Sequence, residues 1–315
     1  MLQIFEKKEG TILILVIGEI LFDIFPDGKR LGGAPFNFAY HLQSMGLPVR
    51  LITRVGNDPD GKEILTALRR YHFNLDTVQI DDEHPTGRVE VRLDESGSPT
   101  FTIVPDVAYD YIEFLPEDHR PLLEQCSLIY FGSLAQRSAR GHKNIQKLIG
   151  HRPPLTRCLY DINLRPAGYT ETAVVQSLAQ TDLLKLSQEE LPVLSRILRF
   201  DGQAETFMQH LREAFEIDAI ALTKGEDGSE LLDAKLHVTS AGDKSTRVVD
   251  TVGAGDGFAS MLAVGYLQGW PPEKILQLAS EFAARICEIP GAVPLQETFY
   301  QPFKRRLTEE NNHDR

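Results

Sequence analysis

Short apolar runs alternate along the chain with segments whose apolar residues recur every three or four positions. The runs predict buried strands at 12–18, 49–55, 127–131, 157–162, 182–186 and 218–223. The periodic segments predict helices at about 35–45, 60–72, 171–179, 188–198, 204–215, 256–268 and 272–288. This alternation predicts an α/β fold with a mostly parallel central sheet covered by helices on both faces.

Two segments depart from the alternation. Val89 and Val91 alternate with polar residues ahead of a Ser-Gly-Ser-Pro turn, which predicts a hairpin with one apolar face at about 84–105. A Pro-Asp-Gly turn predicts a second hairpin at about 21–33. We expect the two to form a small sheet beside the main one, as an edge extension or as a lid over a cleft. Residues 1–315 are otherwise expected to form a single domain.

Composition narrows the class of protein. With 42% hydrophobic and 25% charged residues, the chain has enough apolar material for a core. Its net charge of −12, from 33 basic and 45 acidic residues, disfavours nucleic acid and anionic membranes as partners. An anionic cosubstrate would therefore need local backbone N–H groups or a metal ion. The three cysteines form no Cys-x-x-Cys pair and the first apolar run is too short to span a bilayer, so we expect a cytoplasmic protein.

The strongest local signal is a glycine-rich turn at the start of an almost wholly apolar helix, Gly253-Ala254-Gly255-Asp256. Free N–H groups and the positive end of the helix dipole make such a turn a site for anions. An aspartate there is most often a helix cap. Beside bound phosphate, however, its carboxylate would be repulsive unless it accepts a proton from an attacking hydroxyl.

Two rival phosphate motifs are absent. A dinucleotide-binding Gly-x-Gly-x-x-Gly would need glycine where Phe258 stands. The segment from Gly56 to Gly61 and Lys62 approaches a P-loop, but Glu63 follows where Ser or Thr should bind magnesium.

A second cluster contains Asp23, the pair Gly32-Gly33, and Asn37. Glycines let a backbone approach a ligand closely, and carboxylate and amide groups suit sugar hydroxyls. Taken singly, each of these residues is more often a turn or cap residue. Further polar loops follow predicted strands at 132–133, 161–165, 185–190 and 223–228, on the edge where open parallel sheets bind ligands.

With these residues the chain resembles the ribokinase-like carbohydrate kinases, the PfkB family. Gly32-Gly33 with Asn37 resembles the family's sugar-binding element, and Asp250-Thr-Val-Gly-Ala-Gly-Asp256 resembles its C-terminal signature. Within the family, Gly18-Glu-Ile-Leu-Phe-Asp23, Asp161-Ile-Asn-Leu-Arg165 and Leu186-Ser-Gln-Glu-Glu190 are most similar to fructokinases. The resemblance implies a three-layer α/β/α fold whose two hairpins form a β-lid.

The resemblance also implies roles for single residues. Asp256 would be the base that activates a substrate hydroxyl toward the γ-phosphate of ATP, and the N–H groups of Gly253, Ala254 and Gly255 would hold the developing charge. The implied sugar-binding residues are Asp23, Gly32, Gly33, Asn37 and Arg165. The implied nucleotide-binding residues are Ser187, Thr223, Gly225, Gly228 and Ser280. Glu190 would assist Mg²⁺ indirectly, and Asp250, Val252 and Gly291 would border a monovalent cation such as K⁺. Ser187 departs from the asparagine common in the family, which weakens the magnesium assignment.

The substrate stays open at this stage. Fructose is the leading expectation, with 2-keto-3-deoxygluconate or a nucleoside as competitors, and Arg88 or Arg92 would favour an acidic sugar if either faces the ligand. A sugar or nucleotide sensor without turnover is a further alternative. The resemblance also allows a homodimer joined through the lid.

Overall fold

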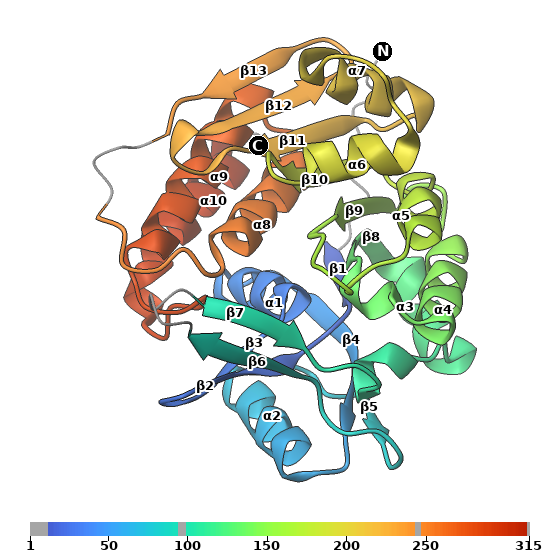
Figure 1. The fold of residues 1–315 in the computed structure, drawn as a ribbon. Coiled ribbons are helices and arrows are strands. Elements are labelled where there is room, and N and C mark those ends of the chain that lie inside the picture. Colours follow the sequence, from blue (N-terminus) through green and yellow to red (C-terminus); the bar gives the residue numbers. More distant parts are fainter. Residues whose placement is uncertain (1–11, 94–98, 243–246, 314–315) are drawn as a thin grey trace.

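The computed structural model describes residues 12–93, 99–242 and 247–313. Its main sheet is built from β1 (Leu13–Ile17), β4 (Val49–Gly56), β5 (Val78–Asp81), β8 (Cys126–Gly132), β9 (Arg157–Asp161), β10 (Leu183–Ser187), β11 (Ala219–Thr223), β12 (Ser229–Asp233) and β13 (His237–Ser240). These nine strands follow the order β13-β12-β11-β10-β9-β8-β1-β4-β5 (Figure 1). From β11 to β5 all neighbours are parallel, whereas β12 and β13 pair antiparallel at one edge.

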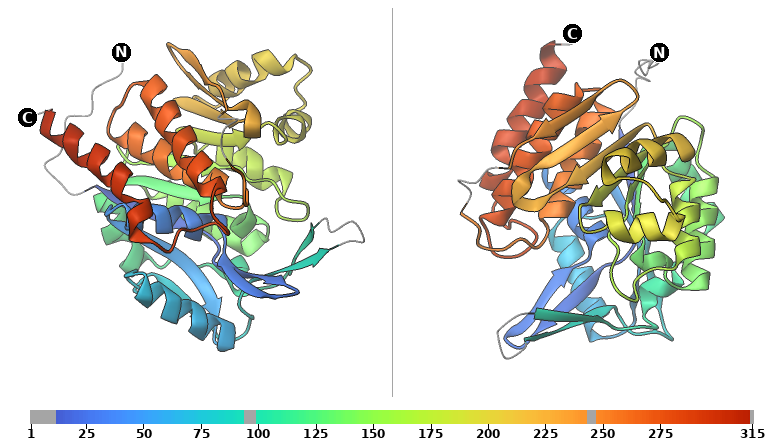
Figure 2. Two further views of the ribbon diagram at one scale, coloured as in Figure 1. Left: turned by 90° about the vertical axis from the view of Figure 1, so that its left-hand side faces the viewer. Right: turned by 45° about the horizontal axis from the view of Figure 1, so that its top comes forward.

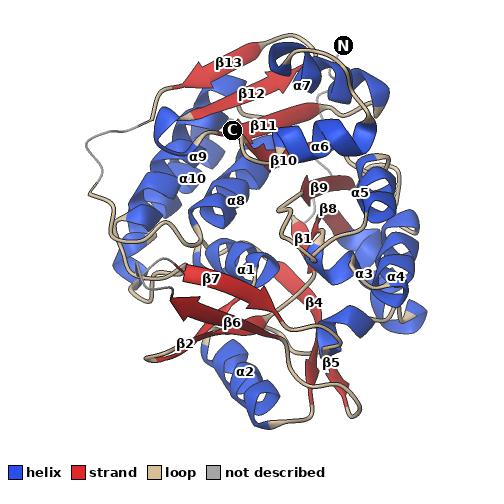
Figure 3. Cartoon of the chain, viewed as in Figure 1, coloured by secondary structure: helices blue, strands red, loops and turns tan. Residues whose placement is uncertain are grey.

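Helices cover both faces of this sheet and complete three layers (Figure 3). One face packs against α1 (Ala34–Ser44), α2 (Pro59–Arg70), α8 (Ala254–Leu267), α9 (Pro272–Cys287) and α10 (Gln301–His313). The other face lies under α3 (Pro116–Gln125), α4 (Ala139–Gly150), α5 (Glu171–Leu178), α6 (Leu191–Leu198) and α7 (Ala204–Ala214). Successive residues of β1 enter opposite cores, Ile14 and Val16 on the first face and Leu15 and Ile17 on the second. Among the described residues, no helix is apolar over a length that would cross a bilayer.

The predicted strands and helices are all present, but the sequence pattern missed six elements of the three layers. Helices α3, α4 and α10 were not predicted, nor were β5, β12 and β13. The apolar stripe of α4 is only Ile145, Leu148 and Ile149, and α3 contains Pro121 in its interior. The predicted helix at 188–198 begins later, at Leu191, because the Glu190 side chain accepts the backbone N–H of Ser187 and holds the preceding turn.

A second sheet of four strands projects from the three layers (Figure 2). It comprises β2 (Leu21–Phe25), β3 (Gly28–Gly32), β6 (Arg88–Leu93) and β7 (Pro99–Ile103), in the order β3-β2-β6-β7. Both predicted hairpins are present, and they join through parallel pairing of β2 with β6. The predicted Ser-Gly-Ser-Pro turn between β6 and β7 falls largely on 94–98, outside the described residues. We call this element the small sheet.

The small sheet is held to α2 by one buried carboxylate. Asp60 accepts hydrogen bonds from Lys29 at 2.8 Å and from Arg88 at 2.7 Å. In β6 the side chains of Arg88 and Val89 point to opposite faces, and Val89 is paired with Asp23 of β2. Arg88 therefore lies on the face opposite Asp23, and its engagement with Asp60 argues against a contact with an acidic sugar at Asp23. The side chain of Arg92 lies outside the described parts of the chain.

Candidate active site

A side-chain hydrogen bond joins two segments that are 219 residues apart in the sequence. The Asn37 amide Nδ2 donates to Asp256 Oδ2 at 2.7 Å. Asn37 lies in the first turn of α1 and Asp256 in the first turn of α8, so the fold brings the N-termini of two helices together. Both residues were predicted as site residues, and the structure places them in direct contact.

The turn before Asp256 has the backbone that its glycines allow. Gly253 caps α8 with φ 81°, a left-handed conformation that other residues adopt at a cost. A Cβ on Gly253 would lie 2.5 Å from Cα of Ala292, so the turn also packs directly against the 291–292 backbone. The first N–H groups of a helix have no intrahelical acceptor. That of Ala254 donates to the Thr251 carbonyl at 3.3 Å, whereas those of Gly255 and Asp256 have no acceptor among the described residues and are available to an anion.

The Asp256 carboxyl titrates in the neutral range. Burial and, to a lesser extent, the nearby carboxylate of Asp161 raise the pKa of Asp256 to about 7. Asn37, Lys185 and Arg165 lower the same pKa and so limit the shift. A carboxyl with a pKa near the working pH is suited to accept a proton and later release it.

Asp23 and the glycine pair adjoin this centre through the start of α1. Asp23 Oδ2 lies 2.6 Å from where a Cβ of Gly32 would be, so the carboxylate rests against a bare backbone. Burial raises the pKa of Asp23 to about 6. Gly33 caps α1 with φ 108°, and its carbonyl accepts the N–H of Asn37 at 2.9 Å. Asp23, Gly32, Gly33 and Asn37 thus form one continuous polar rim that ends at Asp256.

A buried ion pair lies beneath the glycine turn, and its role was not predicted from the sequence. Lys185 Nζ donates to Asp161 Oδ1 at 3.0 Å, and the Tyr130 hydroxyl donates to Asp161 Oδ2 at 3.1 Å. A Cβ on Gly255 would lie 3.1 Å from Lys185 Nζ, which places the ammonium directly against the turn. The sequence indicated this ion pair only by a lysine in the middle of an apolar strand, because a buried charge there is costly unless it is paired.

Glu19 and Tyr109 were also missed. Both are buried, and Glu19 Oε2 and the Tyr109 hydroxyl have no hydrogen-bond partner among the described residues. Burial raises the pKa of Glu19 to about 7, and the Asp256 carboxylate adds to the shift. The signal for Glu19 was its position directly after Gly18 at the end of the first strand.

Glu190 is engaged by the backbone of two loops. Its Oε1 accepts the N–H of Leu164 and its Oε2 that of Ser187, each at 2.7 Å. Both oxygens are therefore in use, and Glu190 would meet Mg²⁺ only through water or after releasing a loop. Across the described ranges no three His, Cys, Asp or Glu side chains converge as metal ligands. This donor set fits a Mg²⁺ held mainly by the phosphates of a nucleotide.

The predicted nucleotide residues lie around the loop that follows β11. Thr223 ends β11, and Gly225 has φ 56° with nothing within 4 Å of where a Cβ would be. Gly228 is tightly packed, since a Cβ there would lie 2.0 Å from the carbonyl oxygen of Ser240. Ser280 of α9 reaches the same loop, because its hydroxyl lies 2.8 Å from that of Ser229.

The three residues predicted beside a monovalent cation are joined to one another. The Asp250 carboxylate accepts the N–H groups of Val252 and Gly291, each at 3.0 Å. These bonds fix two backbone segments side by side, which suits a cation held by carbonyl oxygens. Arg165 is exposed and lies near enough to Asp256 to lower its pKa, though no hydrogen bond between the two is present.

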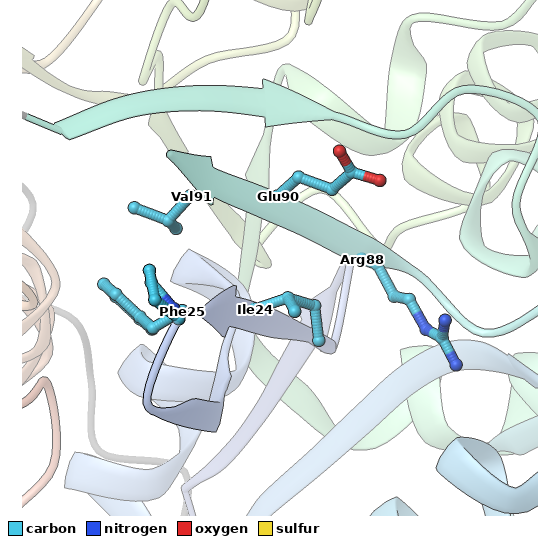
Figure 4. Close-up of a pocket in the computed structure, with 6 residues that line it drawn as sticks. Ile24, Phe25, Arg88, Glu90 and Val91 are labelled. Atoms are coloured by element: carbon cyan, nitrogen blue, oxygen red, sulfur yellow. The ribbon is translucent and has the colours of Figure 1, made fainter. Parts of the chain in front are cut away.

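A separate hollow lies on the small sheet at the end of β2 (Figure 4). It is lined by Ile24, Phe25, Pro26, Arg88, Glu90 and Val91. None of the polar groups gathered around Asp256 lines it. The candidate active site is therefore the rim from Asp23 to Asp256, and not this hollow.

Comparison with known proteins identifies the family and the fold. The model of the pfkB family of carbohydrate kinases matches residues 25–298. A putative sugar kinase of Pyrococcus horikoshii is 28% identical to this chain over 81% of this chain and 83% of its own length. Its crystal structure in complex with ATP superposes with a TM-score of 0.75 at 26% identity, and the superposition covers 89% of this chain and 93% of the other.

A fructokinase of Salmonella typhimurium is 27% identical over 94% of this chain and 98% of its own. The fructokinase of Vibrio cholerae, solved with fructose, ADP and calcium, shares the fold with a TM-score of 0.76 at 22% identity over 94% and 99% of the chains. The family match, the ribokinase-like fold and the paired motifs agree: this chain belongs to the PfkB family of carbohydrate kinases, phosphotransferases that act on a sugar hydroxyl.

Proposed function

We propose that this protein transfers the γ-phosphate of ATP to a hydroxyl group of fructose, with Asp256 as the base. The observation that carries the proposal is the 2.7 Å bond from Asn37 to Asp256, because it joins the sugar-binding element to the phosphate-binding turn. Relatives named as fructokinases support the choice of sugar.

In this proposal each group of the candidate site has a separate part in the reaction. Asp23, Gly33 and Asn37 hold the sugar so that one hydroxyl lies against Asp256, whose pKa of about 7 lets it accept the proton as the hydroxyl attacks. The backbone N–H groups at Gly253, Ala254 and Gly255 face the charge that develops on the transferring group. Mg²⁺, bound through the ATP phosphates, supplies further positive charge there.

The nucleotide lies on the other side of the glycine turn in this proposal. Ser187, Thr223 and Gly225 border its phosphates, and Ser280 lies toward the base. Arg165 closes the site from the exposed side. Backbone carbonyls of the segments at Val252 and Gly291, which the Asp250 carboxylate holds side by side, would bind a monovalent cation such as K⁺.

The small sheet acts as the lid. The face that carries Asp23 is the one turned away from α2, since Arg88 and Lys29 of the opposite face bind Asp60. Closing this face over the sugar excludes water from the transferring phosphate, which favours transfer to the sugar over hydrolysis. The same sheet is the surface we propose for a homodimer, and sedimentation equilibrium tests that part.

Purified protein with ATP and Mg²⁺ is to be incubated with a panel of ketoses, aldoses, sugar acids and nucleosides, with ADP release as the readout. We expect fructose to give the highest kcat/KM. Release that no member of the panel raises above the Asp256→Asn background would sink the proposal. Ligand-dependent thermal stabilisation without ADP release would show instead a sensor built on a kinase scaffold.

A second candidate is an acidic sugar such as 2-keto-3-deoxygluconate. Arg30 favours it, because the antiparallel register of β2 and β3 places Arg30 opposite Asp23 on the same face of the small sheet. Arg30 is paired with Asp27 at 3.0 Å in this structure, so an acidic substrate would compete for it. Higher kcat/KM for the sugar acid than for fructose, lost in Arg30→Gln, would favour this candidate.

A further inference from the structure

One buried ammonium group interacts electrostatically with three acidic side chains around the candidate active site. Lys185 is 6% exposed and lies in β10, between the apolar residues Leu184 and Leu186. Its direct partner is Asp161 at 3.0 Å. It also lowers the pKa of Glu190 and of Asp256, although neither is its hydrogen-bond partner in the structure. A buried lysine normally loses its proton easily, but these acids raise the pKa of Lys185 and keep it charged.

The position of this ammonium is fixed from two sides. The Asp161 carboxylate is itself held by the Tyr130 hydroxyl at 3.1 Å, so it has little freedom to move. On the other side, Lys185 Nζ lies 3.1 Å from where a Cβ of Gly255 would be. The glycine turn therefore lies directly on a fixed positive charge that neither solvent nor a bound ligand has to supply.

We propose that Lys185 is a positioning residue for phosphoryl transfer, whose buried ammonium group holds a fixed positive charge against the glycine turn that leads into Asp256. The catalytic part rests on the proposed function, because it assumes that Asp256 is the base. Other titratable groups face the cluster from neighbouring elements: Glu19 after β1, Tyr130 of β8, Arg165 after β9, and Glu190 before α6. Arg165 is exposed, so Lys185 is the cation shielded from solvent screening.

This assignment gives the ion pair a function beyond stability. A pair that only stabilised the fold would be replaceable by neutral residues of similar size. A pair that controls the ionisation of Asp256 could not be replaced by neutral residues without a loss of activity. Asp161 and Lys185 have opposite effects on the pKa of Asp256, so removing each one should move that pKa in opposite directions.

The direct test is an NMR titration of the full-length protein labelled with ¹³C in its aspartate carboxyl groups. The Asp256 signal is assigned by its loss in Asp256→Asn. We expect Lys185→Met to raise the titration midpoint of Asp256 by about one unit or more, and Asp161→Asn to lower it. Lys147→Met, an exposed lysine on α4, is the matched control and should leave the midpoint unchanged. An unchanged midpoint in folded Lys185→Met would overturn the inference.

The double variant Lys185→Met/Asp161→Asn covers the case in which Lys185→Met does not fold, since it leaves no member of the pair buried alone. In it the two opposite effects on the pKa of Asp256 offset each other, but the glycine turn has lost the ammonium beneath it, so kcat is expected to stay at least about tenfold below that of the parent protein, with ATP binding retained. A kcat equal to that of the parent would show a structural pair and contradict the inference. If the parent protein itself phosphorylates no sugar, the proposed function fails, and the titration midpoint still decides whether Lys185 controls Asp256.

Discussion

Replacing Gly253 by alanine should damage both the fold and the reaction, and a second glycine of the same helix separates the two effects. Gly253 and Gly269 stand at opposite ends of α8 with φ 81° and 67°. A side chain in this conformation costs about 1–2 kcal/mol at either position. At Gly269 nothing lies within 4 Å of the added Cβ, so the backbone cost is the whole effect.

At Gly253 the added Cβ would lie 2.5 Å from both Cα and Cβ of Ala292 and 2.8 Å from its carbonyl oxygen. The backbone of Ala292 must therefore move, which adds about 1–3 kcal/mol. The movement also displaces the N–H groups of the turn, and losing one such donor lowers kcat about a hundredfold or more.

The assay pairs thermal unfolding with ADP release for the two variants. At about 2 °C per kcal/mol for a chain of this size, Gly269→Ala should lower Tm by about 2–4 °C and leave kcat near that of the parent. Gly253→Ala should lower Tm by about 4–10 °C, by the same conversion, and nearly abolish turnover. Equal losses of Tm in the two variants, with kcat intact in Gly253→Ala, would refute the reasoning.

Two further predictions concern pH. Because the pKa of Asp256 is raised to about 7, kcat/KM should fall about tenfold per pH unit below that pH. Asn37→Leu removes a hydrogen bond that lowers this pKa, so it should move the midpoint of the pH profile upward. A downward shift of the midpoint would contradict the assignment of the profile to Asp256. Burial raises the pKa of Glu19 from 4.5 to about 7, so its ionised form costs folding about 3 kcal/mol above pH 7. Stability from this group is present below pH 4.5 and is lost as the pH rises to 7, so the Tm of Glu19→Gln relative to the parent should rise between pH 5 and pH 8. A difference that is constant with pH would count against a buried carboxyl.

Much of the fold could be predicted because its strands and helices carry strong periodic patterns. The strand at Leu13–Ile17 is continuously apolar, and α8 is apolar almost all round, so both were found within a few residues. The missed elements owe their structure to their neighbours. β13, for example, alternates exposed with half-buried residues and is ordered by antiparallel pairing with β12.

The candidate site divides in the same way. Asn37, Gly253 and Asp256 stand in local motifs at helix starts, so the sequence alone marked them as candidates. Lys185 and Glu19 depend on contacts between strands and loops that are far apart in the chain. The role of a charged residue in such a place depends on which carboxyl it meets, and only the three-dimensional fold supplies that partner.

The central claim is that Asp256 accepts the proton of a sugar hydroxyl during transfer of phosphate from ATP. Mass spectrometry of the sugar product, with parent protein and Asp256→Asn compared at equal ATP saturation, tests it most directly. The account predicts a sugar phosphate in step with ADP for the parent, and at least a hundredfold less in the variant, with its affinity for ATP unchanged. Sugar phosphate formed by Asp256→Asn at the parent rate would contradict it.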